Sequence, residues 1–167
     1  MTHPLVEQLR FARSEWQRGL RGVPEADGLR RFEPMNSIGW IVAHMAWHEQ
    51  RYWLTRLTGE TPAPILNQVA PNGGPATTPS LKAMRKAWAT VTTAADPYLD
   101  ALDEAAMQRD LPGSPPRTYG NAILRVTYHY WFHTGEIHAI RQLLDDRRRP
   151  EFVGNIDDQA PYRPAGG

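Results

Sequence analysis

The chain has 167 residues, of which 41% are hydrophobic and 22% charged, an ordinary composition for one soluble globular domain with its own core. Its 19 basic and 18 acidic residues give a net charge of +1, so no basic excess favours a nucleic-acid partner. Cysteine is absent, which excludes disulfides, thiolate metal sites and a cysteine nucleophile, and fits a cytoplasmic protein. The charges scattered through residues 1–16 predict neither a signal peptide nor a membrane span.

Four segments carry apolar residues at the three- and four-residue intervals of an amphipathic helix. They span residues 4–21, 37–57, 79–107 and 118–144. Asn36 or Ser37 is suited to cap the second helix and Thr118 the fourth, whereas Asp96-Pro97 is expected to kink or end the third. Loops are expected at residues 24–35, 59–79 and 110–117.

These patterns, with no convincing strand, predict an all-α fold, a four-helix bundle in one domain over residues 1–167. Residues 59–79 hold most of the proline and glycine between the helices. They predict a long irregular connection, which in compact domains is often functional. Residues 146–167 contain three prolines and end in Gly-Gly, so they predict an irregular tail.

Histidines occupy the apolar face of the predicted fourth helix. His129 and His133 lie on one stripe with Val126, Ile137 and Ile140. Because they are four residues apart, their side chains lie one turn apart and can converge on one point. A buried imidazole needs a partner for each ring nitrogen, and two neighbouring imidazoles meet that need by sharing a metal ion.

The second predicted helix repeats the pattern, since His44 lies among apolar residues and His48 follows four residues later. The simpler interpretation is that these are core histidines bonded to carbonyl groups. Spaced pairs on two separate helices favour a metal site, and spacing alone leaves both interpretations open. In the metal interpretation, His48 is either a substitute ligand or a group that supports the ligands.

Other metal and catalytic motifs fit less well. The segment "HEQRY" (48–52) begins like the zinc-protease motif H-E-x-x-H, but Tyr52 replaces the second histidine. A di-iron bundle needs two Glu-x-x-His motifs, which the sequence lacks. No G-x-S-x-G, P-loop or G-x-G-x-x-G motif occurs either.

Two blocks resemble motifs of the DinB/YfiT-like superfamily. "NSIGWIVAHMAWHEQRYW" (36–53) is similar to its second-helix motif, an apolar run that ends in a metal-binding histidine. "HYWFHTGEIHAIRQLL" (129–144) is similar to its fourth-helix motif, with two histidines four apart, a glycine, a Gln or Glu, an aliphatic residue and an arginine. The first and third helices match only in pattern.

The resemblance implies a four-helix bundle, often a homodimer, that holds a divalent metal, nickel or zinc. The ligands that it implies are His44, His129 and His133. Glu136 stands where the family commonly has glutamine, and Arg141 falls on the arginine of the motif. Some relatives are transferases or isomerases that use mycothiol, bacillithiol or glutathione, and many have no known activity.

Three neutral imidazoles leave a divalent metal with open positions, which is typical of catalytic rather than structural sites. A thiol or a water there loses its proton more readily. Because the chain has no cysteine, thiol chemistry requires a low-molecular-weight thiol and a small-molecule substrate. We therefore expect a thiol S-transferase, with a metal-dependent hydrolase or a non-enzymatic binding module as alternatives. Glu136, Glu49 and Arg141 are candidates to assist the ligands.

Overall fold

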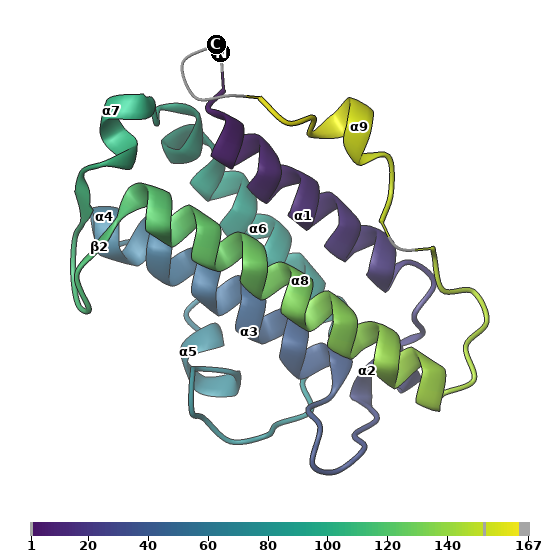
Figure 1. Ribbon diagram of the computed structural model, residues 1–167. Helices are drawn as coiled ribbons and strands as arrows, with labels where there is room; N and C mark the ends of the chain where they lie inside the picture. The colour runs from purple at the N-terminus through teal and green to yellow at the C-terminus, as the bar shows by residue number, and fades with distance from the viewer. Residues whose placement is uncertain (1, 152, 164–167) are drawn as a thin grey trace.

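The computed structural model describes residues 2–151 and 153–163, and most of them lie in helices. Four long helices lie side by side (Figure 1), and they correspond to the four segments expected from the sequence. They are α1 (Pro4–Leu20), α3 (Ile38–Gln50), α6 (Leu81–Asp100) and α8 (Tyr119–Leu143).

Local signals begin these helices at the expected places. The side chains of Ser37 and Thr118 accept hydrogen bonds from the backbone N–H groups of Trp40 and Asn121, so they cap α3 and α8. α6 begins at Leu81, two residues after Pro79, because Ser80 provides its cap.

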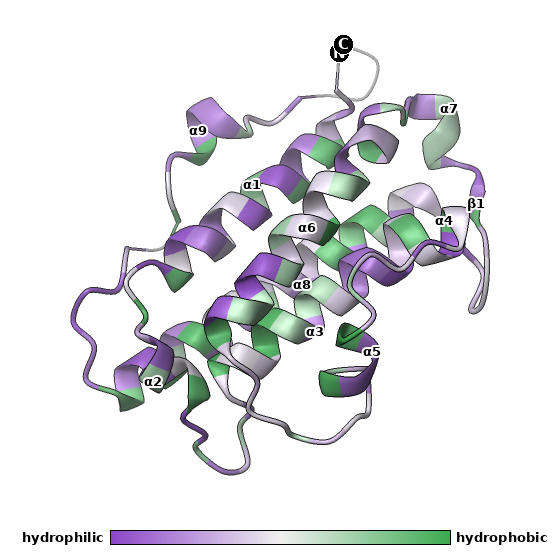
Figure 2. Cartoon of the chain, turned by 180° about the vertical axis from the view of Figure 1, so that it is seen from behind, coloured by the Kyte–Doolittle hydropathy of each residue, from purple (hydrophilic) through white to green (hydrophobic). Residues whose placement is uncertain are grey.

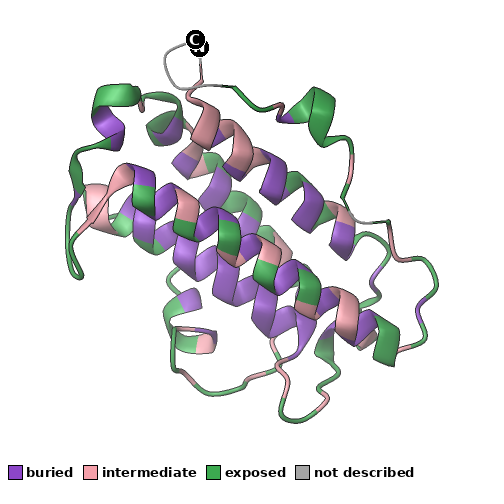
Figure 3. Ribbon diagram, viewed as in Figure 1, coloured by how far each residue is buried: buried purple, intermediate pink, exposed green. Residues whose placement is uncertain are grey.

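The helices pack in pairs, α1 on α8 and α3 on α6, and α3 also contacts α8. Every residue of α3 is buried, so this helix forms the centre of the core (Figure 3). α8 is buried on one side and exposed on the other. In α1 only Ser14 and Gln17 are exposed, although its outer side is largely hydrophilic (Figure 2). At the α3–α8 contact, the buried side of α8 lies against the fully buried helix α3.

The second expected helix changes character after Gln50. A π-helical turn, η1 (Arg51–Thr55), follows α3, and α4 (Arg56–Thr58) completes the segment. Gly59 then ends it in the left-handed conformation, with φ 78°, as glycine readily does. A π-helical turn inserts an extra residue per turn, and such turns are frequent at functional sites.

The expected loops contain short elements that the sequence patterns did not reveal. They are α2 (Glu25–Leu29), α5 (Leu66–Val69), the antiparallel pair β1 (Asp110–Leu111) and β2 (Arg117–Thr118), and, in the tail, α9 (Ile156–Gln159). A further short helix, α7 (Glu104–Met107), lies within the segment expected as the third helix. The expected end of the third helix at Pro97 is wrong, because α6 continues through it to Asp100. α7 is a separate turn rather than a continuation of α6.

The expected tail, residues 146–167, runs beside α1 as far as it is described (Figure 1). The Gln8 side chain donates to the carbonyl of Ala160 at 2.7 Å, and the backbone N–H of Gly154 donates to Glu15 at 2.8 Å. These contacts, together with α9, give the tail a fixed path over α1. Across residues 2–151 and 153–163, every helix is too short or too polar to cross a bilayer.

Candidate metal centre

Four histidines from α3 and α8 meet where the two helices pack. His44 and His48 come from α3, and His129 and His133 from α8. The ring centroids of neighbouring histidines are 4.4 Å apart for His48 and His129 and 5.3 Å apart for His44 and His133. We call these four residues the histidine cluster. Each helix contributes a pair spaced by four residues, so both pairs project from one face of their helix.

Three members of the cluster form the tightest group. The ring nitrogens that His44, His48 and His129 offer all lie within 4.8 Å of one another. His133 adjoins this group through His129, since their Nε2 atoms lie 2.8 Å apart. The structure therefore brings together all three histidines that the resemblance implies as ligands. It adds His48, which the sequence left as either a substitute ligand or a group that supports the ligands.

The members differ in their hydrogen-bond partners. The Nδ1 atom of His44 lies 3.1 Å from the carbonyl oxygen of Ala70, in the loop after α5, and Nδ1 of His133 contacts the Glu136 carboxylate. Both ring nitrogens of His48 are buried and have no partner among the described residues. Buried polar atoms nearly always have partners, so this imidazole fits a bound ion or ligand.

Burial also lowers the pKa values of three members of the cluster. It lowers the pKa of His44 to about 4, against the opposing effect of the hydrogen bond to Ala70. Burial, with the neighbouring imidazoles of His129 and His44, lowers the pKa of His48 to about 2. Burial and the neighbours His133 and His44 lower the pKa of His129 to about 3. These three imidazoles are neutral at pH 7, the state in which histidine binds metals.

Aromatic side chains line the cluster on the α3 side. The Trp40 ring stacks on His44 with a centroid distance of 4.7 Å, and the Tyr52 ring stacks on His48 at 6.1 Å. Trp40 and Trp47 also donate hydrogen bonds to the loop that includes α5, at Pro75 and Asn67. The long connection of residues 59–79 thus covers one side of the histidine cluster.

Cations gather around Tyr52. The guanidinium groups of Arg56 and Arg117 lie over its ring at 5.0 and 5.8 Å, and Arg51 lies over the neighbouring Trp47 ring at 5.3 Å. Within residues 2–151 and 153–163 these three arginines form no ion pair, and NH1 of Arg56 is buried without a partner. Burial, followed by the charge of Arg51, lowers the pKa of Arg56. We call Arg51, Arg56 and Arg117 the arginine group.

The other site residues expected from the sequence have different surroundings. The Glu49 side chain is fully buried, accepts two hydrogen bonds from Arg13, at 2.8 and 2.7 Å, and accepts a third from Tyr130 at 2.7 Å. Arg141 is also fully buried; its guanidinium donates to Asp146 and to the carbonyl of Gly19. Of the three residues expected to assist the ligands, only Glu136 directly contacts a histidine of the cluster.

Comparisons with known proteins show the family to which the chain belongs. A search of curated proteins found no match to the chain. The family model of the DinB superfamily matches residues 8–137, which include α3 and all four histidines of the cluster. With most of its length in the match, the chain belongs to the DinB superfamily.

Proposed function

We propose that this chain is a four-helix bundle that binds a divalent metal, nickel or zinc, through its histidine cluster and acts as a thiol S-transferase. The observation that carries the proposal is the histidine cluster itself, in which four imidazoles from α3 and α8 lie in contact with one another. Cores seldom hold four adjacent imidazoles, and a metal ion would satisfy their free electron pairs. The packing of α1 on α8 and of α3 on α6 and α8 supports the bundle.

His44 and His129 are proposed as ligands because they belong both to the tightest group of nitrogens and to the set implied by the resemblance. We propose His133 as the third ligand. Its Nδ1 contacts the Glu136 carboxylate, an arrangement that commonly orients metal-binding imidazoles and directs Nε2 toward the ion. His48 is the alternative third ligand, and substitution of each histidine distinguishes the two sets.

When bound, the metal would supply Lewis acidity, which lowers the pKa of a thiol or water in an open position. The chain itself supplies neutral imidazoles, because burial keeps the pKa values of His44 and His129 far below 7. The rings of Trp40 and Tyr52 exclude water beside them. Since the chain contains no cysteine, the reacting thiol must come from a small molecule.

The arginine group favours a thiol that carries negative charge. Arg56 and Arg117 lie around Tyr52, which stacks on His48, so the group adjoins the histidine cluster. The three cations form no ion pair with the described residues and repel one another, so a carboxylate between them would relieve that repulsion and accept hydrogen bonds from them. We therefore expect a thiol with carboxylates, as glutathione has, to react faster than a neutral thiol of similar size.

A thiol panel tests the activity. Mycothiol, bacillithiol, glutathione and 2-mercaptoethanol are each mixed with a reactive aryl halide or an epoxide, on metal-loaded and on chelated protein. We expect thioether formation only with metal, and fastest with an anionic thiol. Hydrolysis of the epoxide without any thiol would contradict the transferase proposal and favour a metal-dependent hydrolase. No turnover across the panel, with metal bound, would replace it with a binding module.

We also propose a homodimer, in line with the resemblance. Large apolar side chains are exposed along α8, where Tyr128 and Phe132 are each 65% exposed and Leu143 is 57% exposed. Tyr128 and Phe132 are four residues apart and therefore share a helix face. Exposed aromatic side chains grouped on one face favour a protein interface.

A further inference from the structure

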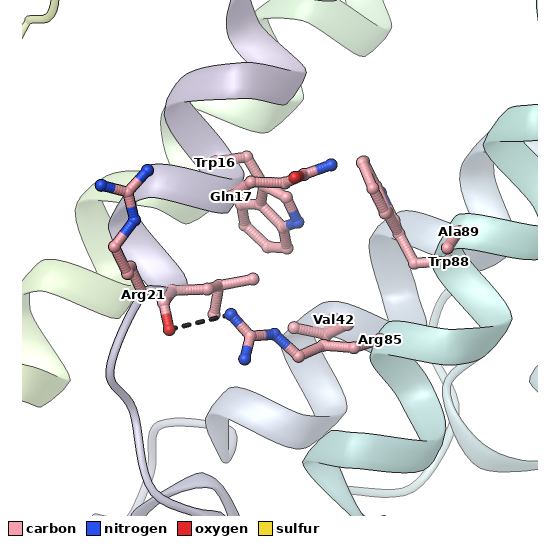
Figure 4. Close-up of a pocket in the computed structure, with 8 residues that line it drawn as sticks. Trp16, Gln17, Arg21, Val42, Arg85, Trp88 and Ala89 are labelled. Carbon is pink, nitrogen blue, oxygen red and sulfur yellow. Dashed lines mark hydrogen bonds between the residues drawn. The ribbon is translucent and has the colours of Figure 1, made fainter.

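A cavity lies between α1 and α6, and its lining includes no histidine of the cluster. α1 packs mainly on α8, and α6 mainly on α3, which leaves a space of about 350 Å³ between them. Val42 of α3 lines it together with side chains of α1 and α6 (Figure 4). This volume falls within the range of small-molecule sites, and no histidine lines it.

Two indole rings form apolar walls of this cavity. Trp16 of α1 and Trp88 of α6 lie on either side of it (Figure 4), and they are only 1% and 7% exposed. Trp88 is fixed in place, because its Nε1 donates to the hydroxyl of Tyr130 at 2.7 Å. Rigid indole faces suit a flat apolar group.

The charged groups in the cavity are donors, and no anionic side chain among the described residues lines it. Arg85 donates to the carbonyl of Leu20 at 3.0 Å, and the part of the chain that the structure describes gives it no ion pair. By contrast, the buried Arg13 and Arg141 are each paired with a carboxylate. Burial accordingly lowers the pKa of Arg85.

Trp16 adds a second donor, since its buried Nε1 has no partner among the described residues. The only charged side chains that line the cavity are Arg21 and Arg85, and both are cationic. The cavity therefore combines positive charge, a free N–H group and apolar walls, a set of groups that suits a ligand with an anionic end and a flat apolar body.

We propose that this cavity binds a small aryl carboxylate. The carboxylate accepts hydrogen bonds from the Arg85 guanidinium and the Trp16 indole N–H, and the ring lies between the indoles of Trp16 and Trp88. The site is separate from the proposed metal centre and does not require a metal.

Calorimetric titration with phenylacetate and with its neutral analogue phenylacetamide tests this site, on the full chain in metal-loaded and in chelated form. We expect saturable binding of phenylacetate in both forms. Phenylacetamide should bind about tenfold more weakly, because it forms no charge-assisted hydrogen bond with Arg85.

Matched variants locate the binding. Arg85→Met should weaken phenylacetate binding about tenfold, whereas Lys86→Met, which removes a neighbouring exposed charge, should leave it unchanged. Trp16→Phe keeps an aromatic wall, removes the N–H group and should weaken binding about threefold. Circular dichroism confirms that each variant is folded.

The following outcomes would overturn the proposal. They are absence of saturable binding at millimolar phenylacetate, equal affinity for the amide, and full affinity in folded Arg85→Met. Loss of binding on chelation, or in His44→Ala, would place the ligand at the histidine cluster and would also overturn it.

Discussion

The Nε2 atoms of His129 and His133 lie 2.8 Å apart, while Nδ1 of His133 contacts the Glu136 carboxylate. The carboxylate accepts a hydrogen bond from Nδ1–H, which leaves the electron pair of the His133 ring on Nε2 to accept a hydrogen bond from Nε2–H of His129. A metal ion between the two rings would replace this hydrogen bond. Glu136 thereby sets which nitrogen of His133 is free to bind a metal.

Glu136→Gln introduces the residue common in the superfamily and tests this relationship. The amide is a weaker acceptor than the carboxylate, so it holds the His133 tautomer less firmly. We expect metal affinity to fall about tenfold, with no loss of helicity. Competition with a chromophoric chelator measures the affinity, and unchanged affinity would show that Glu136 does not act through His133.

The buried histidines should make the metal-free protein sensitive to mild acid. An unfolded imidazole titrates near 6.5, whereas the pKa values of His44, His129 and His48 in the folded chain are about 4, 3 and 2. Below pH 6.5 the unfolded chain therefore binds protons that the folded chain does not. This contribution to stability is complete above pH 6.5 and is lost progressively toward pH 4 and below.

Urea unfolding of the metal-free protein between pH 7 and pH 4 measures this effect. The midpoint should fall with pH, and it should fall less in His48→Leu, which removes one of the titrating groups. Carboxylates titrate in both proteins, so the difference between the two slopes isolates the imidazole. Identical slopes would contradict the lowered pKa of His48.

The ion pair of Arg13 and Glu49 should contribute to stability rather than to metal binding. Glu49 is fully buried and bound by Arg13 through two hydrogen bonds, so Glu49→Leu leaves a buried guanidinium beside only the partly exposed Asp96. We expect a loss of about 3–5 kcal/mol in the free energy of unfolding. The double variant Arg13→Met/Glu49→Leu should recover most of it, and metal stoichiometry should not change.

Denaturant unfolding of Arg13→Met, of Glu49→Leu and of the double variant completes this double-mutant cycle. If their losses simply add, then the two side chains do not stabilise each other. If folded Glu49→Leu loses its metal, Glu49 supports the histidine cluster after all, as the sequence analysis considered.

Phe132→Lys should dissociate the proposed dimer. The substitution places a charge in the exposed apolar stretch of α8, and burial of that charge at an interface is unfavourable. Tyr98→Lys on α6 is the matched control, since Tyr98 is also an exposed aromatic residue. Sedimentation at tens of micromolar should give a dimer for the wild type and the control; a wild-type monomer would contradict the proposal.

Local patterns in the sequence predict the long helices well, because the spacing of buried residues and the capping groups Ser37 and Thr118 lie within each helix. The pairs His44/His48 and His129/His133 are visible for the same reason. Their meeting depends on how α3 packs against α8, which no local pattern encodes. The contact of Ala70 with His44 joins residues 26 positions apart, so local patterns could not predict it either.

The short elements were missed because their stability comes from contacts rather than from periodicity. α5 packs on α3, and α9 lies over α1, so each has neighbours that its own sequence does not reveal. The π-helical turn at Arg51–Thr55 leaves no periodic signal either. Sequence reasoning likewise treated Glu49 and Arg141 as site candidates, although the partners of both are buried ionic groups outside the histidine cluster.

Metal content of the four single histidine-to-alanine variants tests the central claim most directly. The proteins are purified without an affinity tag or added metal and analysed by elemental mass spectrometry. We predict about one nickel or zinc ion per chain in the wild type and in His48→Ala, and almost none in His44→Ala, His129→Ala or His133→Ala. If the metal is lost in His48→Ala and retained in His133→Ala, then His48 replaces His133 as the third ligand. A metal-free wild type that binds no added nickel or zinc would contradict the metal centre itself.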